Sequence, residues 1–183
     1  LELNEVNTIT DSEKTIYSKL NEIITWLRKR HLIPNEQKKE ETILSLRKVL
    51  RMSDISKLDS IVATGAFRVS QKTTVDPVIM GAWIRLCQVT GEQNTRVISR
   101  FDTQNVEQLI FDLKKIMVNS NADLRKDLTD VMARYGIKFS LVHNFRGAPV
   151  HGYISQNKDG EYQMALTIRG AFADIFWFSL FHE

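Results

Sequence analysis

The sequence ends on FWFSLFHE, residues 176–183, where an apolar run closes with His182 and Glu183. An imidazole followed by a carboxylate at the end of a helix matches the start of the pattern H-E-x-x-H. In that pattern two histidines, four residues apart on one helix face, bind one Zn²⁺. The glutamate between them acts as general base toward the metal-bound water. By this reading His182 is a metal ligand and Glu183 is the catalytic base.

The pattern is incomplete within the 183 residues, because the second histidine would lie four positions after His182. A catalytic zinc ion takes three protein ligands, so His182 by itself cannot hold one. We therefore expect this polypeptide to be catalytically inactive and Zn²⁺ to bind only in a longer parent protein. The missing initiator methionine at the start, LELNEVN, also favours a fragment.

The segment that would position these two residues is strongly apolar. Between residues 171 and 181 only Asp174 and Ser179 are polar, which is typical of a helix in a protein core. Burying His182 and Glu183 beside that core without partners would be costly, so we expect them at a surface, in a cleft or on a metal ion. If the helix lacks its natural partner helices, its aromatic side chains are left exposed, and we then expect the chain to self-associate.

The remaining elements follow from hydrophobic periodicity. Helical spacing of apolar residues dominates up to Gly136, with a capping box at Thr10 and Glu13 and a helix start at Asp76–Pro77. After Gly136 the segments IKFSLVH, GAPVHGYISQ and EYQMALTI have the composition of strands and are separated by turn sequences. We predict an α+β fold: a helical N-terminal half, then a small antiparallel three-stranded sheet, then a buried C-terminal helix.

Other residues could also do chemistry. His143 and His151 flank a predicted turn and could approach one another across a hairpin, either as metal ligands or as solvated strand-end histidines. Arg169 and Asp174 flank the link into the last helix, where we expect them to form an ion pair. Cys87 lies on an apolar helix stripe, so we expect a small core residue and not a nucleophile.

Composition excludes several classes of protein. The chain is 43% hydrophobic and 26% charged, as in ordinary globular proteins. A single cysteine excludes an intrachain disulfide and a multi-cysteine zinc site, and it favours the cytoplasm. The sequence has neither a signal peptide nor an apolar run long enough to span a membrane. The densest basic stretch, WLRKRHLI, could contact phosphates, but a solvated helix face also explains it.

The C-terminal third resembles a known family. The string QMALTIRGAFADIFWFSLFHE is similar to the approach to the active site in ImmA/IrrE-type metallopeptidases, notably members fused to a Cro/repressor-type helix-turn-helix, such as HigA-like antitoxin regulators. The similarity comprises a strand at 164–168, a link at Arg169 and Gly170, and a helix whose matching residues are Asp174, Phe176, Trp177, Phe178, Leu180, Phe181, His182 and Glu183. Upstream, RYGIKFSLVHNFRGAPVHGYI is similar to the helix and two strands that precede this point in the family.

The resemblance implies a bacterial or phage transcriptional regulator or antitoxin with a zinc-dependent endopeptidase domain of zincin-like fold. Residues 121–183 would be the N-terminal half of that domain, residues 65–120 a helical connector, and residues 1–64 a helical linker or interaction region. Of the family's functional positions only the metal ligand, His182, and the catalytic residue, Glu183, are present. The implied partners are a regulatory protein substrate or a toxin, DNA through a helix-turn-helix domain outside this chain, and a second copy in a homodimer.

Two other functions stay open. The chain could be a non-catalytic regulatory or dimerisation module that keeps the peptidase fold for protein binding. It could also be a helical interaction module without chemistry. The residues that follow Glu183 in the parent distinguish these functions, because only the enzyme needs a histidine and a third ligand there.

Overall fold

The computed structural model describes residues 8–62, 74–93, 97, 99–157, 159–167 and 173–182, together with the backbone of residues 66–69. The chain divides into two compact units, each of which is discontinuous in sequence. The first comprises Leu1–Thr64, Thr73–Val89 and Phe145–Pro149, and the second comprises Gly65–Lys72, Thr90–Asn144 and Val150–Glu183. The predicted segment 65–120 therefore contributes to both units.

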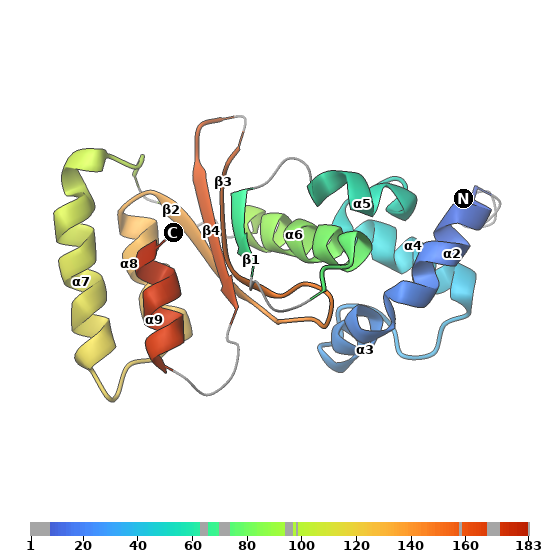
Figure 1. Ribbon diagram of the computed structural model, residues 1–183, viewed down its shortest axis with the longest axis horizontal. Coiled ribbons are helices and arrows are strands. Elements are labelled where there is room, and N and C mark those ends of the chain that lie inside the picture. The colour runs from blue at the N-terminus through green and yellow to red at the C-terminus, as the bar shows by residue number, and fades with distance from the viewer. Residues whose placement is uncertain are drawn as a thin grey trace. The chain divides into compact units, whose positions relative to one another are not determined.

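The first unit is helical. It contains α2 (Asp11–Lys19), α3 (Asn21–Lys29), α4 (Lys39–Leu50), the 3₁₀ helix η1 (Ile55–Lys57), α5 (Leu58–Ile61) and most of α6 (Pro77–Glu92) (Figure 1). The two predicted helix starts are confirmed. The Thr10 hydroxyl accepts a hydrogen bond from the Glu13 N–H, and the Glu13 carboxylate accepts one from the Thr10 N–H. Asp76 caps α6 by accepting from the Val78 N–H at 2.9 Å.

Glu13 is fully buried and joins three elements of this unit. Its carboxylate accepts hydrogen bonds from Nε and Nη2 of Arg47 at 2.8 and 2.6 Å and from the Ile55 N–H at 3.2 Å. These bonds connect α2 to α4 and η1. Burial by itself raises the pKa of Glu13, but the hydrogen bonds from Arg47, Thr10 and Ile55 together outweigh burial and hold the pKa below its usual value.

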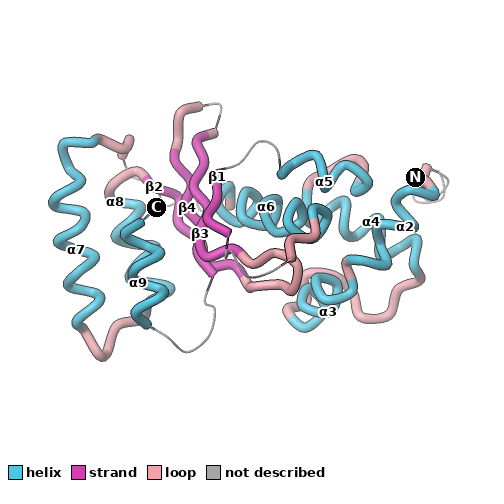
Figure 2. Tube along the Cα trace, viewed as in Figure 1, coloured by secondary structure: helices cyan, strands magenta, loops and turns pink. Residues whose placement is uncertain are grey.

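The second unit contains a sheet and the helices that cover it. Its elements are β1 (Ala66–Val69), η3 (Thr103–Asn105), α7 (Val106–Val118), α8 (Leu124–Arg134), β2 (Ile137–Val142), β3 (Val150–Gln156), β4 (Tyr162–Thr167) and α9 (Ala173–His182). The strands pair in the order β1-β3-β4-β2 (Figure 2). In Figure 1, α7, α8 and α9 lie on the same side of the sheet, where α8 packs on β2, α9 on β3 and β4, and α7 on α8.

The α+β class is confirmed, but the sheet is mixed and has four strands, so the prediction of an antiparallel three-stranded sheet is wrong in detail. β3 and β4 form the predicted antiparallel hairpin, closed by Asn157, whose side chain accepts from the N–H groups of Asp159 and Glu161. This turn commits one edge of β4 to β3. β2 therefore pairs with the other edge, where its direction is parallel, with Ile137 opposite Tyr162. β1 adds an antiparallel strand beside β3.

One side of α9 is buried, as predicted, and the other is not. Trp177 and Leu180 pack into the apolar cluster that α7, α8 and α9 form with the sheet. Ile175, Phe178 and Phe181 are 40%, 61% and 39% exposed. α9 thus carries an apolar stripe that the described residues leave uncovered. None of the helices in the described part of the chain is long and apolar enough to cross a membrane.

The Glu13–Arg47 pair predicts an acid-dependent loss of stability. Because the folded-state pKa of Glu13 is lowered, its stabilising contribution is present above the unfolded-state pKa and is lost as the pH falls through the folded-state pKa. We expect Glu13→Ala to lower the free energy of unfolding at neutral pH by about 3–5 kcal/mol, near the lower value because Arg47 keeps some exposure to solvent. Urea denaturation between pH 3 and 7 measures the free energy of unfolding of both proteins. The pH dependence that the wild type shows and Glu13→Ala lacks should correspond to about one titrating group.

Asp11→Asn is the matched control for this experiment. The Asp11 side chain is 98% exposed, and among the described residues its ion-pair partner is Lys14, three residues away, at 3.2 Å. We expect this change to leave both the stability and its pH dependence close to those of the wild type. An equal effect of the two substitutions contradicts the role assigned to Glu13.

Candidate functional site

α9 carries the predicted metal ligand to its C-terminal end. His182 is exposed, and its ring stacks on that of Phe178, with 6.3 Å between centroids and 18° between planes. Within the described part of the chain no hydrogen bond or ion pair reaches the His182 imidazole. Its ring nitrogens are thus open to a ligand. Glu183 lies outside the described residues, as does Arg169, the predicted partner of Asp174.

A cavity of about 390 Å³ lies next to His182 in the second unit. Its walls are formed by α7, by α9 and by the sheet. Apolar side chains from all three contribute, among them Leu109, Leu113, Ile137, Met164, Leu180 and Phe181. The polar side chains that line it are those of Tyr162 and His182. The imidazole therefore lies at the edge of an apolar space and not in a polar cluster.

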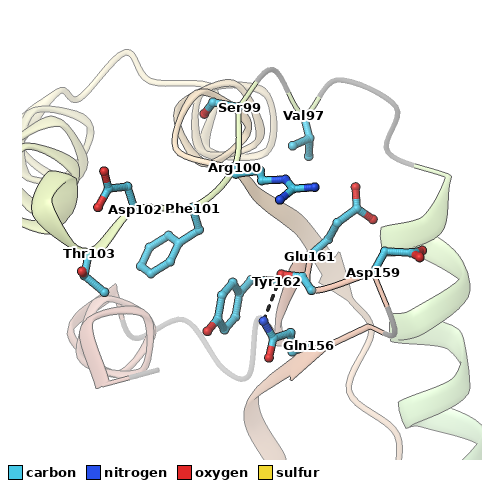
Figure 3. Close-up of a pocket in the computed structure, with 12 residues that line it drawn as sticks. Val97, Ser99, Arg100, Phe101, Asp102, Thr103, Gln156, Asp159, Glu161 and Tyr162 are labelled. Carbon is cyan, nitrogen blue, oxygen red and sulfur yellow. Dashed lines mark hydrogen bonds between the residues drawn. The ribbon is translucent and has the colours of Figure 1, made fainter.

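A larger and more polar cavity, of about 830 Å³, opens beside the β3–β4 turn. Figure 3 shows Arg100 extending toward Glu161, while Phe101 and Tyr162 lie side by side away from these charges. The rings of Phe101 and Tyr162 make an edge contact with 5.1 Å between centroids. Both residues also line the apolar cavity. This aromatic pair is consequently a wall that the two cavities share.

Glu161 is held in its charged form. Its carboxylate accepts hydrogen bonds from the Lys138 ammonium at 2.6 Å and from the Asn157 side-chain amide at 2.7 Å. The bond from Lys138 and then that from Asn157 lower the pKa of Glu161, against a smaller opposite effect of burial. A carboxylate with a lowered pKa is a poor general acid at neutral pH. Glu161 therefore serves to fix the turn and does not suit proton transfer.

The loop segment that carries Phe101 is positioned by a glycine. Gly136 ends α8 with φ +81°, as the sequence predicted, and a side-chain Cβ there would lie 2.3 Å from the Phe101 backbone nitrogen. The Ser99 hydroxyl donates to the Arg134 carbonyl at 2.7 Å and holds the same segment against the end of α8. Only glycine allows this close approach.

The other candidate residues do not assemble a site. β4 lies between β2 and β3, so His143, which follows β2, and His151 in β3 are about two strand spacings, roughly 10 Å, apart. The hairpin across which they were predicted to approach is therefore not formed, because β4 separates the two strands. Cys87 is 2% exposed and burial raises the pKa of its thiol, which confirms it as a core residue.

The described residues do not form a zinc site by themselves. None of their His, Cys, Asp and Glu side chains gather in groups of three that could hold a metal ion. His182 supplies one nitrogen donor where a catalytic zinc ion needs three protein ligands. Within the described part of the chain, His182 therefore counts as one donor and not as a complete site.

Sequence reasoning missed Phe101, Tyr162 and Arg100, because nothing in their spacing marks them. Phe101 precedes a helix cap at Asp102, and Tyr162 opens a strand, so both look structural in the sequence. The parallel pairing of β2 with β4 is what places Tyr162 near the segment of Phe101. No protein-family model, no curated protein and no solved structure matches this chain.

The contact at Gly136 can be tested against a second glycine that has nearly the same backbone angle. Gly160 has φ +79°, but a Cβ there would meet only the Gln156 side chain, at 3.7 Å. Alanine at either position is destabilised by the positive φ, which residues other than glycine rarely adopt. We expect Gly136→Ala to be more destabilising than Gly160→Ala by about 1–3 kcal/mol, because it also displaces Phe101.

Urea denaturation of the two variants measures this difference. We also expect the near-UV circular dichroism to change in Gly136→Ala alone, since the Phe101–Tyr162 contact is disturbed there. Equal costs for the two glycines contradict the close approach of residues 99–101 to Gly136.

Proposed function

We propose that this chain belongs to a cytoplasmic transcriptional regulator or antitoxin, of bacteria or phage, that carries an ImmA/IrrE-like zinc-dependent endopeptidase domain. The observation that carries the proposal is the exposed imidazole of His182 at the end of a helix anchored on a sheet. Its ring is without a hydrogen-bond partner in the described part of the chain and lies beside a cavity. In this proposal His182 is a metal ligand and Glu183 the catalytic general base.

The way in which α9 is held supports this role. Trp177 and Leu180, on its buried side, pack against the sheet and fix the direction in which the helix ends. β4, which precedes α9 in sequence, is hydrogen-bonded on both edges. Metal ligands work best on rigid elements whose orientation is set by packing. The proposed partners are a regulatory protein substrate or a toxin, and DNA bound by a helix-turn-helix domain outside this chain.

Zinc content of the full-length gene product tests the proposal. We expect about one Zn²⁺ per chain, as for a catalytic zinc site, measured by inductively coupled plasma mass spectrometry. His182→Ala should lower the zinc content at least tenfold, because one of three protein ligands is lost. Glu183→Gln should keep the zinc and lose cleavage of the protein substrate, because only the general base is removed.

His143→Ala is the matched control, since His143 is also an exposed histidine of the second unit. This variant should keep both zinc and activity. A full-length protein that neither contains zinc nor takes it up on titration would rule out the metallopeptidase.

The alternative, a non-catalytic dimerisation module, is favoured by a different observation. The stripe formed by Ile175, Phe178 and Phe181 leaves a large apolar side chain, Phe178, 61% exposed. An apolar surface of this kind, rimmed by polar residues, is typical of a protein interface. A second copy of the chain is the occupant we propose for it.

Light scattering tests this alternative. The wild type should shift from monomer toward dimer as its concentration rises, and Phe178→Glu should remain monomeric because a buried charge is unfavourable at an interface. Phe111→Glu is the control, since Phe111 is 54% exposed on α7 and not on α9. A wild type that stays monomeric at high concentration contradicts dimerisation through α9, whatever its zinc content.

A further inference from the structure

The apolar cavity beside α9 is partly open to solvent, and side chains of the apolar cluster form much of its wall. Six of the residues that line it belong to the main apolar cluster of the second unit: Leu109, Leu113, Met132, Ile137, Met164 and Leu180. Its volume of about 390 Å³ falls in the range of ligand pockets. Its mainly apolar wall favours a ligand that removes apolar surface from water.

The polar groups at this cavity indicate what kind of head group a ligand with an apolar chain would carry. His182 and Tyr162 line it, and in the part of the chain that the structure describes neither side chain donates a hydrogen bond to a protein acceptor. An imidazole N–H and a phenolic O–H are both donors. Two donors at the edge of an apolar space match a ligand whose head group accepts hydrogen bonds.

We propose that the cavity binds a monocarboxylic acid with an unbranched apolar chain of about ten carbons, a length that suits its volume. The chain lies among Leu109, Leu113 and Met164, and the carboxylate accepts hydrogen bonds from His182 and Tyr162. This inference goes beyond the proposed function and needs no metal ion. Because α7 and α9 both line the cavity, the ligand couples these two helices and stabilises the folded state that binds it.

The other open surfaces of the second unit do not suit this ligand. The larger cavity is lined by the charged side chains of Arg100, Asp159 and Glu161, which an alkyl chain would desolvate. Of the α9 stripe only Phe181 lines the cavity. Ile175 and Phe178 are exposed outside it, where no wall encloses an alkyl chain. Specific binding is therefore expected at the apolar cavity.

Isothermal titration calorimetry with decanoate tests the proposal, with two companion probes. Acetate has the same head group without the chain, and decanol has the same chain without the carboxylate. We expect saturable binding of one decanoate per chain and a rise in the thermal midpoint of unfolding. Acetate should not bind measurably, and decanol should bind at least tenfold more weakly.

Three variants locate the binding site. Ile110→Phe extends a half-buried lining residue of α7 into the cavity and should abolish binding of decanoate and decanol alike. His182→Ala should weaken decanoate at least tenfold and weaken decanol much less, because the hydroxyl of decanol carries no charge. Ile175→Ala is the control, because Ile175 is exposed on the same helix but does not line the cavity, and it should bind as the wild type does.

Circular dichroism establishes that each variant is folded, and Val106→Phe replaces Ile110→Phe if the latter unfolds. No saturable binding of decanoate overturns the proposal. Binding that survives both the cavity-filling change and His182→Ala also overturns it, because the acid then sits on exposed apolar surface. Zinc content is measured separately, so a failure here is distinguishable from a failure of the metallopeptidase proposal.

Discussion

The second unit depends on the position of β4, which is hydrogen-bonded along both edges. β3 pairs with it in the antiparallel sense and β2 in the parallel sense, so the strand can neither shift its register nor tilt without breaking two ladders. Residues 163–167 are all buried as a result. The Thr167 hydroxyl donates to the Val150 carbonyl at 2.6 Å and ties the end of β4 to the start of β3. Because β4 is held in this way, it gives the next element, α9, a rigid surface to pack on.

α9 follows β4 in sequence and packs on it with one side, which leaves its other side exposed. Its buried residues, Trp177 and Leu180, meet the cluster to which Met164 and Leu166 of β4 contribute. The same packing leaves Phe178 and His182 exposed and places His182 at the edge of the apolar cavity. The features on which the functional proposals rest, the open imidazole, the apolar stripe and the cavity, thus follow from one helix packing on one strand.

The features predicted correctly from the sequence are those that depend on residues a few positions apart. Thr10 and Glu13 are three residues apart, so the sequence alone predicts their capping box. The turn sequence between the last two predicted strands, which contains Asp159 and Gly160, predicts the β3–β4 hairpin in the same way. Arg47, the partner of Glu13, lies 34 residues further along the chain, and no local pattern selects it. The parallel pairing of β2 with β4 was not predicted either. It depends on which edge of β4 is left after the hairpin has formed, and no local pattern shows this.

For the candidate site, the motif placed His182 correctly at an exposed helix end, but a helix that is apolar on nearly all sides does not reveal which side is covered. The cavity and the Phe101–Tyr162 pair arise from contacts between segments distant in sequence.

We propose that α9, anchored on the sheet, holds the ring of His182 in position to bind a metal ion. Side-chain ¹⁵N NMR of the full-length gene product, titrated with one equivalent of Zn²⁺, tests it most directly. We expect the ring nitrogen resonances of His182 to shift on metal binding while those of His143 stay in place. If the His182 resonances are unchanged at saturating zinc, the imidazole is not a metal ligand and α9 does not serve a zinc site.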